Sequence, residues 1–128
     1  MLMADLVRLF TSYGATPGRY VAAAAADQDA TVVKAGPGVL KSCVATNLAG
    51  AVRYVKWYDQ ATPPTAADAP VQVYPLVPAT DGAGGCVPLP PEGLAFAAGI
   101  AFRLTAGLAD GDATPVAAGE FCLSYAYQ

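Results

Sequence analysis

The clearest structural signal in this chain is the stretch Glu120-Phe121-Cys122-Leu123-Ser124-Tyr125-Ala126-Tyr127. Its large apolar side chains alternate with small or polar ones along its whole length. Successive side chains of a strand point to opposite faces, so this period of two predicts a β-strand with one apolar face. An all-β fold is therefore the first expectation for the rest of the chain.

Similar short segments recur between clusters of glycine and proline. Ile100–Thr105 alternates in the same way, and Val52–Tyr58 is rich in β-branched and aromatic residues, although both of its faces carry aromatic side chains. Pro75 places the strand expected at Val71–Val77 at a sheet edge or a bulge, because proline donates no ladder hydrogen bond. The remaining expected strands are Thr31–Ala35, Val39–Thr46, Leu94–Ala97 and the alanine-rich Ala22–Ala26.

About eight short strands joined by Pro/Gly turns predict a single antiparallel β-sandwich over residues 1–128, in particular a jelly roll. A chain of 128 residues is long enough to bury one core of this kind. For residues 1–17 we expect an N-terminal arm or a first strand, although the spacing of their apolar residues also fits a helix.

Composition excludes several classes of function. The chain has no histidine, so it offers no imidazole base and no His-bound metal. Seven Lys and Arg against ten Asp and Glu give a net charge of -3, so we expect no nucleic-acid partner. No apolar run approaches the roughly 20 residues that span a bilayer. Asp5 and Arg8 interrupt what would be the apolar part of a signal peptide. We expect no membrane partner and synthesis in the cytoplasm.

The three cysteines, Cys43, Cys86 and Cys122, are widely spaced and form no CxxC pair. Without histidine they cannot complete a four-ligand zinc site within one chain. We expect buried, reduced thiols that pack as small apolar side chains. A pair closed by oxidation is the alternative, which a cytosolic environment disfavours.

Two polar clusters could carry chemistry, but each has a simpler interpretation. Asp110 and Asp112 could face one cation, yet the Gly- and Asp-rich stretch around them favours a turn, because a calcium site needs more oxygen ligands. Lys56, Tyr58 and Asp59 could suggest acid–base chemistry. On an alternating strand Asp59 faces away from the other two, so we expect a solvated strand end. We predict no catalytic, cofactor-binding or metal-ligating residues.

Other segments also have two interpretations. Tyr54, Trp57 and Tyr58 could form a sugar-stacking platform, but we favour core and inter-sheet packing for strand aromatics. Pro88–Gly93 could be a polyproline ligand, but we favour a rigid turn. Gly82–Gly85 lacks the Lys-Ser/Thr of a phosphate-binding loop and is expected to connect a hairpin.

One further pattern begins after Ala45-Thr46-Asn47 and reads Arg53-Tyr54-Val55-Lys56-Trp57-Tyr58-Asp59-Gln60-Ala61-Thr62-Pro63-Pro64-Thr65. It resembles the pattern R-[YF]-x-K-x-Y-[DN]-x-A-x-x-P-[T] of small structural proteins of tailed bacteriophages. Further matches, in the same order, are Pro88–Phe96, Gly99–Thr105 and Ala109–Glu120. The resemblance thus extends over most of the chain, from Thr31 to Tyr127.

The resemblance implies a jelly-roll decoration protein, also called a cement or head-stabilising protein, on the outer surface of a phage capsid. Its partners would be the major capsid protein and further copies of itself, as a homo-oligomer at capsomer junctions, and it would be made in the host cytoplasm. The 55% hydrophobic content agrees, because it exceeds what a monomer of this size readily hides. No cofactor and no enzymatic activity are expected.

For contacts with neighbouring subunits we expect Leu6, Leu9 and Phe10, as part of an arm, together with Tyr54 and Tyr58. Completion of the core is the alternative role of the first three. The alternative function is a receptor- or glycan-binding β-sandwich module of a phage tail or fibre. A hydrolase whose acids meet only in the fold is a third possibility.

Overall fold

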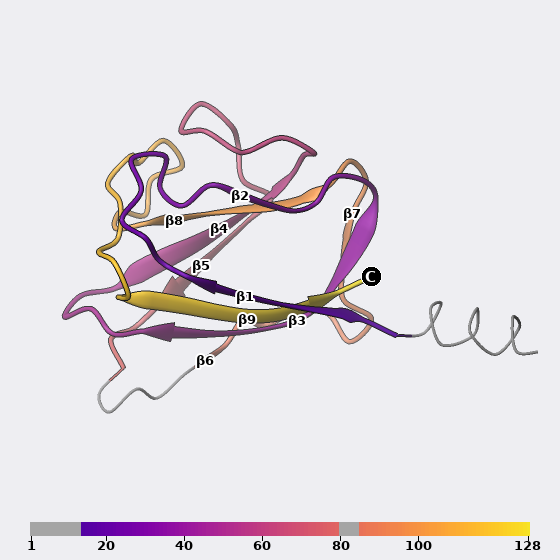
Figure 1. Cartoon of the computed structure of the whole chain (residues 1–128), viewed down its shortest axis with the longest axis horizontal. Coiled ribbons are helices and arrows are strands. Elements are labelled where there is room, and N and C mark those ends of the chain that lie inside the picture. The colour runs from indigo at the N-terminus through magenta and orange to yellow at the C-terminus, as the bar shows by residue number, and fades with distance from the viewer. Residues whose placement is uncertain (1–13, 80–84) are drawn as a thin grey trace, which may run out of the picture.

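The computed structural model describes residues 14–79 and 85–128 of the chain, which form strands and turns and no helix (Figure 1). Nine strands follow one another: β1 Thr16–Val21, β2 Thr31–Lys34, β3 Gly38–Asn47, β4 Arg53–Asp59, β5 Gln72–Leu76, β6 Gly85–Cys86, β7 Leu94–Phe96, β8 Ile100–Thr105 and β9 Phe121–Tyr127.

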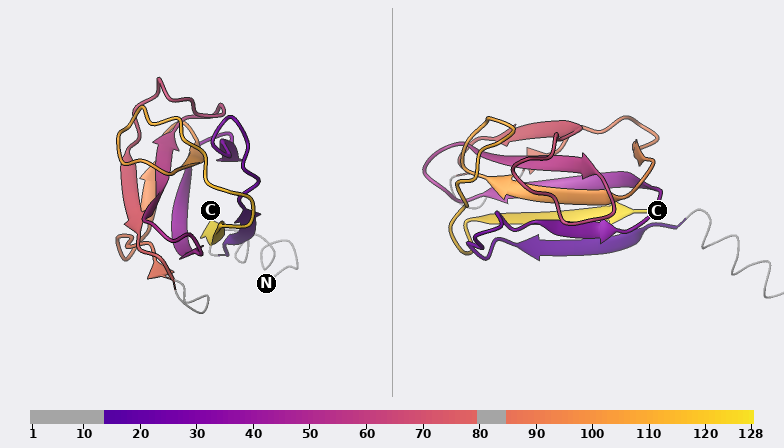
Figure 2. Two further views of the ribbon diagram at one scale, coloured as in Figure 1. Left: turned by 90° about the vertical axis from the view of Figure 1, so that its left-hand side faces the viewer. Right: turned by 90° about the horizontal axis from the view of Figure 1, so that it is seen from above.

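The strands build two antiparallel sheets that face each other (Figure 2). Sheet A has the order β1-β9-β3-β6, with β7 also paired with β3, and sheet B has the order β2-β8-β4-β5. Because β6 and β7 pair with successive parts of β3, they share one position in sheet A. The predicted antiparallel β-sandwich is confirmed. The chain passes from one sheet to the other at most connections, and the jelly-roll interpretation of this order stays a prediction.

Seven strands, β2 to β5 and β7 to β9, lie within one residue of the bounds expected from the sequence. Pro75 lies in β5, an edge strand of sheet B, where its missing N–H is tolerated.

The expectation of a strand at Ala22–Ala26 is wrong. Ala24 has a positive φ of 58°, which breaks an extended backbone, and Gln28 N donates to Ala25 O in a turn. The first strand is instead β1, which includes Pro17 and Gly18 at the edge of sheet A. Residues 1–13 lie outside the described residues.

The core lies between the sheets and is centred on aromatic rings. Trp57, Phe102, Tyr20 and Tyr125 pack edge to face, with ring centroids between 5.3 and 6.4 Å apart. Such pairs contribute about 0.5–1.5 kcal/mol each beyond the area they bury. Core packing is therefore confirmed for Trp57, whose side chain has 0% exposure.

Candidate functional site

The outer face of sheet B is covered by the chain itself. On β4 and β8, side chains of both faces are buried, and those directed away from sheet A include Lys56, Tyr58 and Arg103 at 0% exposure. The loop between β1 and β2 and the loop that follows β8 lie over this face (Figure 1). Sheet B thus offers no open face along these two strands.

Arg103 holds both loops in place. Its Nε donates to the Tyr58 hydroxyl at 3.0 Å, and its Nη1 donates to Gln28 Oε1 at 2.9 Å. The guanidinium also donates to the carbonyl oxygens of Asp110 at 2.9 Å and Asp112 at 3.1 Å. One buried side chain therefore ties two strands and two loops together, and each of its bonds is charge-assisted.

Lys56 adds a second buried cation beside Arg103. Its Nζ donates to the carbonyl oxygen of Ala109 at 2.5 Å. Burial, and then the charge of Arg103, lower the pKa of Lys56, while the charges of Asp112 and Asp110 act in the opposite direction. Lys56 and Arg103 thus bind the loop after β8 through three backbone carbonyl oxygens, those of Ala109, Asp110 and Asp112.

That loop is the turn expected around Asp110 and Asp112. The Asp112 carboxylate accepts hydrogen bonds from the backbone N–H of Gly107 at 3.2 Å and of Thr114 at 2.9 Å. Carbonyl oxygens that a calcium ion would need are already bound by Lys56 and Arg103. Within residues 14–79 and 85–128, no three acidic or cysteine side chains gather as a group that could hold a metal ion.

Two expectations for β4 are corrected by this arrangement. Lys56 and Tyr58 are not part of a solvated strand end, because the two loops cover them. Tyr58 is consequently not available as a surface contact, and with Trp57 in the core the sugar-stacking platform does not exist. Tyr54 is half-buried on the outer side of sheet B, and its predicted contact stays a prediction.

Asp59, at the end of β4, also has a structural partner. Its carboxylate accepts hydrogen bonds from the backbone N–H groups of Ala97 at 3.1 Å, Ala98 at 2.8 Å and Gly99 at 3.3 Å. These bonds, that of Ala98 first, lower the pKa of Asp59. The carboxylate therefore fixes the connection between β7 and β8 and does not face Lys56.

The outer face of sheet A, in contrast, is open. Strands β1, β9 and β3 each present three side chains there, and their register aligns the side chains in rows across the sheet. The rows are Pro17, Ala126 and Ser42, then Arg19, Ser124 and Val44, then Val21, Cys122 and Thr46. We call these nine residues the sheet A face.

The sheet A face is small-chained and nearly uncharged. All nine residues are exposed or half-buried, and Arg19 is the one charged residue of the set. Val21 and Val44, with 39% and 46% exposure, are large apolar side chains that the fold leaves exposed. From the strand spacing and the rise per residue, the face covers roughly 300 Å².

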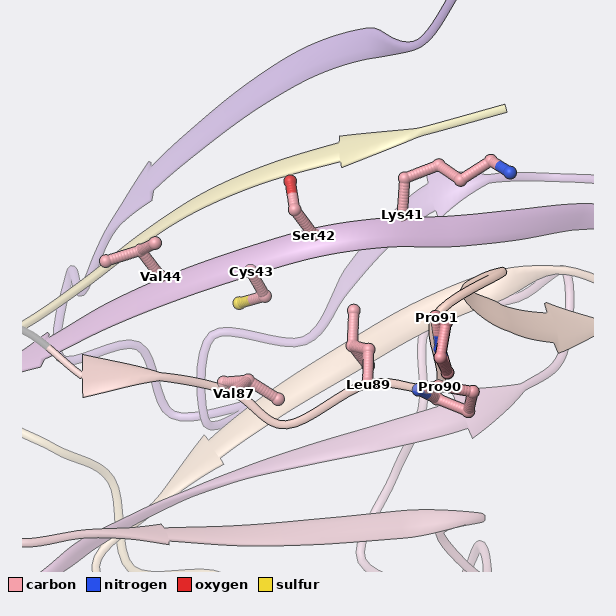
Figure 3. A pocket seen from close by; sticks show the side chains of 8 residues that line it. All are labelled: Lys41, Ser42, Cys43, Val44, Val87, Leu89, Pro90 and Pro91. Atoms are coloured by element: carbon pink, nitrogen blue, oxygen red, sulfur yellow. The ribbon is translucent and has the colours of Figure 1, made fainter. Parts of the chain in front are cut away.

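A groove of about 320 Å³ lies beside this face, between β3 and the segment that joins β6 to β7 (Figure 3). The residues that line it are Lys41, Ser42, Cys43 and Val44 from β3, and Val87, Leu89, Pro90 and Pro91 from the joining segment. Figure 3 shows Leu89 extending from this segment toward β3. The groove is mostly apolar and opens to solvent.

The wall formed by the joining segment is rigid. Gly93 N donates to Pro90 O at 2.8 Å, which closes the turn expected at Pro88–Gly93. Gly93 has a φ of 92°, and a Cβ there would lie 2.6 Å from Leu40 O, so glycine allows the turn to approach β3. The Lys41 ammonium donates to Glu92 O at 3.3 Å and fastens the turn from the other side.

The described cysteine side chains lie on opposite faces of sheet A. Cys43 is buried beside Ala45, which faces the core, whereas Cys122 is half-buried on the sheet A face, between the inward-facing Phe121 and Leu123. Side chains on opposite faces cannot be bridged without backbone movement. The side chain of Cys86 lies outside what the structure describes.

Comparison with known proteins provides no relative. No family model matches the chain, and neither a curated protein nor a solved structure does so. No helix among the described residues is long and apolar enough to cross a membrane. The predicted contact residues Leu6, Leu9 and Phe10 lie outside the described residues, so the sheet A face and the adjoining groove are the candidate functional site.

Proposed function

We propose that this protein is a non-enzymatic structural component of a tailed-phage virion. In this role it decorates the outer surface of the head and stabilises it by bridging subunits of the major capsid protein. The observation that carries the proposal is the contrast between the two sheets: the outer face of sheet B is covered over its central strands, whereas the sheet A face is open and nearly uncharged.

The side chains of the sheet A face suit docking onto a protein surface. Pro, Ala, Ser, Cys, Thr and Val lose little rotamer freedom when an interface immobilises them. The cost of ordering is therefore low, and apart from Arg19 no charge has to be desolvated. The covered sheet B, fixed by Arg103, supplies a rigid support for this face.

The size of the face argues for many copies acting together. Roughly 300 Å² is well below the ~800 Å² per partner of a stable protein interface, so one face alone binds weakly. Copies joined into a homo-oligomer on a repeating shell would combine such weak contacts, because linked attachment multiplies the effective affinity. Leu6, Leu9 and Phe10 are the proposed additional anchor.

The residues that carry the phage resemblance support this proposal at the level of the fold. Arg53 pairs with Glu120 at 3.3 Å across the sandwich, and Asn47 donates to Ala51 O and Leu76 O. Lys56 and Asp59 hold loops. These residues hold the sandwich together. A pattern made of such residues fits proteins that share a jelly-roll fold and differ in their surfaces.

The alternative of a glycan-binding module loses its proposed site, because Trp57 and Tyr58 are buried. We therefore place the decoration role first.

Binding to capsids that lack their decoration protein tests the proposal. The purified chain should co-sediment with such capsids from its source phage and raise their resistance to heat or chaotrope.

Ser124 lies at the centre of the sheet A face, so Ser124→Glu should weaken binding by roughly tenfold or more, as for a charge placed in an interface core. Thr62→Glu adds the same charge on an exposed loop and should bind normally. A wild-type chain that leaves capsids unbound and unaltered would refute the proposal.

A further inference from the structure

We infer that the groove beside β3 receives apolar side chains from the N-terminal segment, residues 1–13, of a second copy of this chain. The inference deepens the proposed function, since it rests on the self-association proposed there and names its basis. It concerns the groove, which shares Ser42 and Val44 with the sheet A face and adds Leu89, Pro90 and Pro91.

The groove is formed before any partner arrives. The turn that makes one wall is closed by its own hydrogen bond and held to β3 by Lys41 and by the bond from Val87 N to Cys43 O at 2.9 Å. Val87 and Cys43 form a buried floor. A volume of about 320 Å³ is at the low end of ligand pockets, which suits a few side chains of an incoming segment.

The chain itself contains a matching segment. Residues 1–13 include Leu2, Leu6, Val7, Leu9 and Phe10, a higher density of large apolar side chains than most of the chain shows.

The strand register places the start of β1 at the same end of the sandwich as the groove. Thr16 is paired with Tyr127, and Tyr127 is paired on its other side with Leu40, next to Lys41 in the groove. The first described residues therefore enter sheet A at the end where the groove begins, two strands away, or ~10 Å.

The direction of β1 favours a second copy over the same chain. β1 runs from Thr16 inward along the sheet, so the chain enters this strand from that end of the sandwich. To fill its own groove, the segment would have to reverse direction and cross β9 and β3. A neighbouring copy placed end to end requires no such reversal.

Oligomeric state in solution tests the inference with the full-length chain. By sedimentation or light scattering, wild type should self-associate, and the combined substitution Leu6→Ser, Leu9→Ser and Phe10→Ser should raise the apparent dissociation constant by roughly tenfold or more. Leu89→Asp should do the same from the groove side. The control Leu108→Ser removes an exposed leucine on the far loop, over sheet B, and should self-associate as wild type does.

A cysteine pair identifies the occupant. After treatment with oxidised glutathione as the oxidant, Phe10→Cys with Pro90→Cys should give a disulfide-linked dimer on a non-reducing gel, whereas Phe10→Cys with Leu108→Cys should not. This pair and the triple variant decide the question if Leu89→Asp proves unfolded by circular dichroism. A monomeric wild type, a triple variant that associates normally, or a crosslink found only within one chain would overturn the inference. Capsid binding is a separate readout: loss of association in the triple variant supports the groove even if wild type ignores capsids.

Discussion

Lys56 of β4 and Arg103 of β8 are directly opposite each other across a strand pair, and both side chains are fully buried. Two like charges in this position destabilise a sheet unless other groups compensate. The compensation comes from the carbonyl oxygens of Ala109, Asp110 and Asp112, which accept hydrogen bonds from the two cations. The loop after β8 is therefore part of the structure of sheet B rather than a passive connection.

Replacing the two cations should have unequal effects. Arg103→Leu leaves the partners at Tyr58, Gln28 and two carbonyls without their donor, and we expect a loss of about 3–5 kcal/mol in the free energy of unfolding. Lys56→Met leaves one carbonyl unpaired but also removes a buried charge and its repulsion by Arg103, so the loss should stay below about 2 kcal/mol. Urea unfolding of both variants measures the difference. Equal losses would contradict the central role of Arg103.

Calcium should not stabilise the protein. Because Lys56 and Arg103 bind the carbonyl oxygens of the loop, a divalent cation placed near Asp110 and Asp112 would meet two buried positive charges. The melting temperature should be the same in millimolar Ca²⁺ and in a chelator. A rise with Ca²⁺ that Asp112→Asn abolishes would show that the loop binds the ion.

Gly18 should not tolerate a side chain. A Cβ there would lie 2.2 Å from Cε2 of Tyr125, a ring that packs on Trp57 and Phe102. Gly18→Ala must displace that ring and should lower the free energy of unfolding by about 1–3 kcal/mol. Gly36→Ala, where a Cβ would meet nothing within 4 Å, serves as the matched control. Equal stability of the two variants would contradict the packing seen in the structure.

The same glycine explains why the bounds of the first strand, expected within residues 1–17, could not be predicted. Ala15-Thr16-Pro17-Gly18 has the composition of a turn. An edge strand tolerates Pro17, and the ring of Tyr125, over 100 residues away in sequence, requires Gly18. The strands predicted well, β8 and β9 for instance, are those in which alternation reflects burial against the opposite sheet. The residues of Ala22–Ala26 are all alanine, so no alternation of large and small side chains distinguishes one face of a strand from the other. The strand predicted there was therefore wrong.

The burial of the outer face of sheet B likewise could not be predicted from local sequence patterns. Alternation in β8 directs Arg103 to the face of the sheet that Phe102 and Leu104 do not share. In an antiparallel sheet a charged side chain on that face is usually exposed to solvent. Its burial depends on two loops that lie far apart in sequence, one before β2 and one after β8. The open sheet A face could be predicted in part, because Cys122, Ser124 and Ala126 alternate with the core residues of β9. The alignment of its rows needed the strand register.

Stability in acid should depend on Asp59. Hydrogen bonds from the backbone of Ala98 and Ala97 lower its pKa below the usual 3.8, so the folded state binds this proton less readily than the unfolded state. The resulting stabilisation is present above pH 3.8 and is lost as pH falls through the lower, folded pKa. Unfolding titrations should therefore show a flatter acid limb for Asp59→Asn than for wild type, with Asp110→Asn as the control for a lost charge. Superimposable acid limbs for Asp59→Asn and wild type would contradict the role of these bonds.

At alkaline pH Tyr20 should contribute to the loss of stability, alongside Tyr58, Tyr74 and Tyr125, whose pKa values burial also raises. Its hydroxyl donates to Asp29 Oδ1 at 2.7 Å, and burial, this bond and the Asp29 charge raise the pKa of Tyr20 from 10.0 to about 12. In the window between these values the unfolded chain loses the phenolic proton while the folded chain keeps it, so the unfolding free energy falls as pH rises.

Below pH 10.0, Tyr20→Phe should be less stable than wild type by about 1–2 kcal/mol, because Asp29 loses a donor. From pH 10.0 to 12 the two curves should converge, since only wild type has this proton to lose. Asp29→Asn, which removes the charge, should also flatten the wild-type slope in this window. Curves that run parallel across it would show that the Tyr20–Asp29 bond does not couple folding to this ionisation.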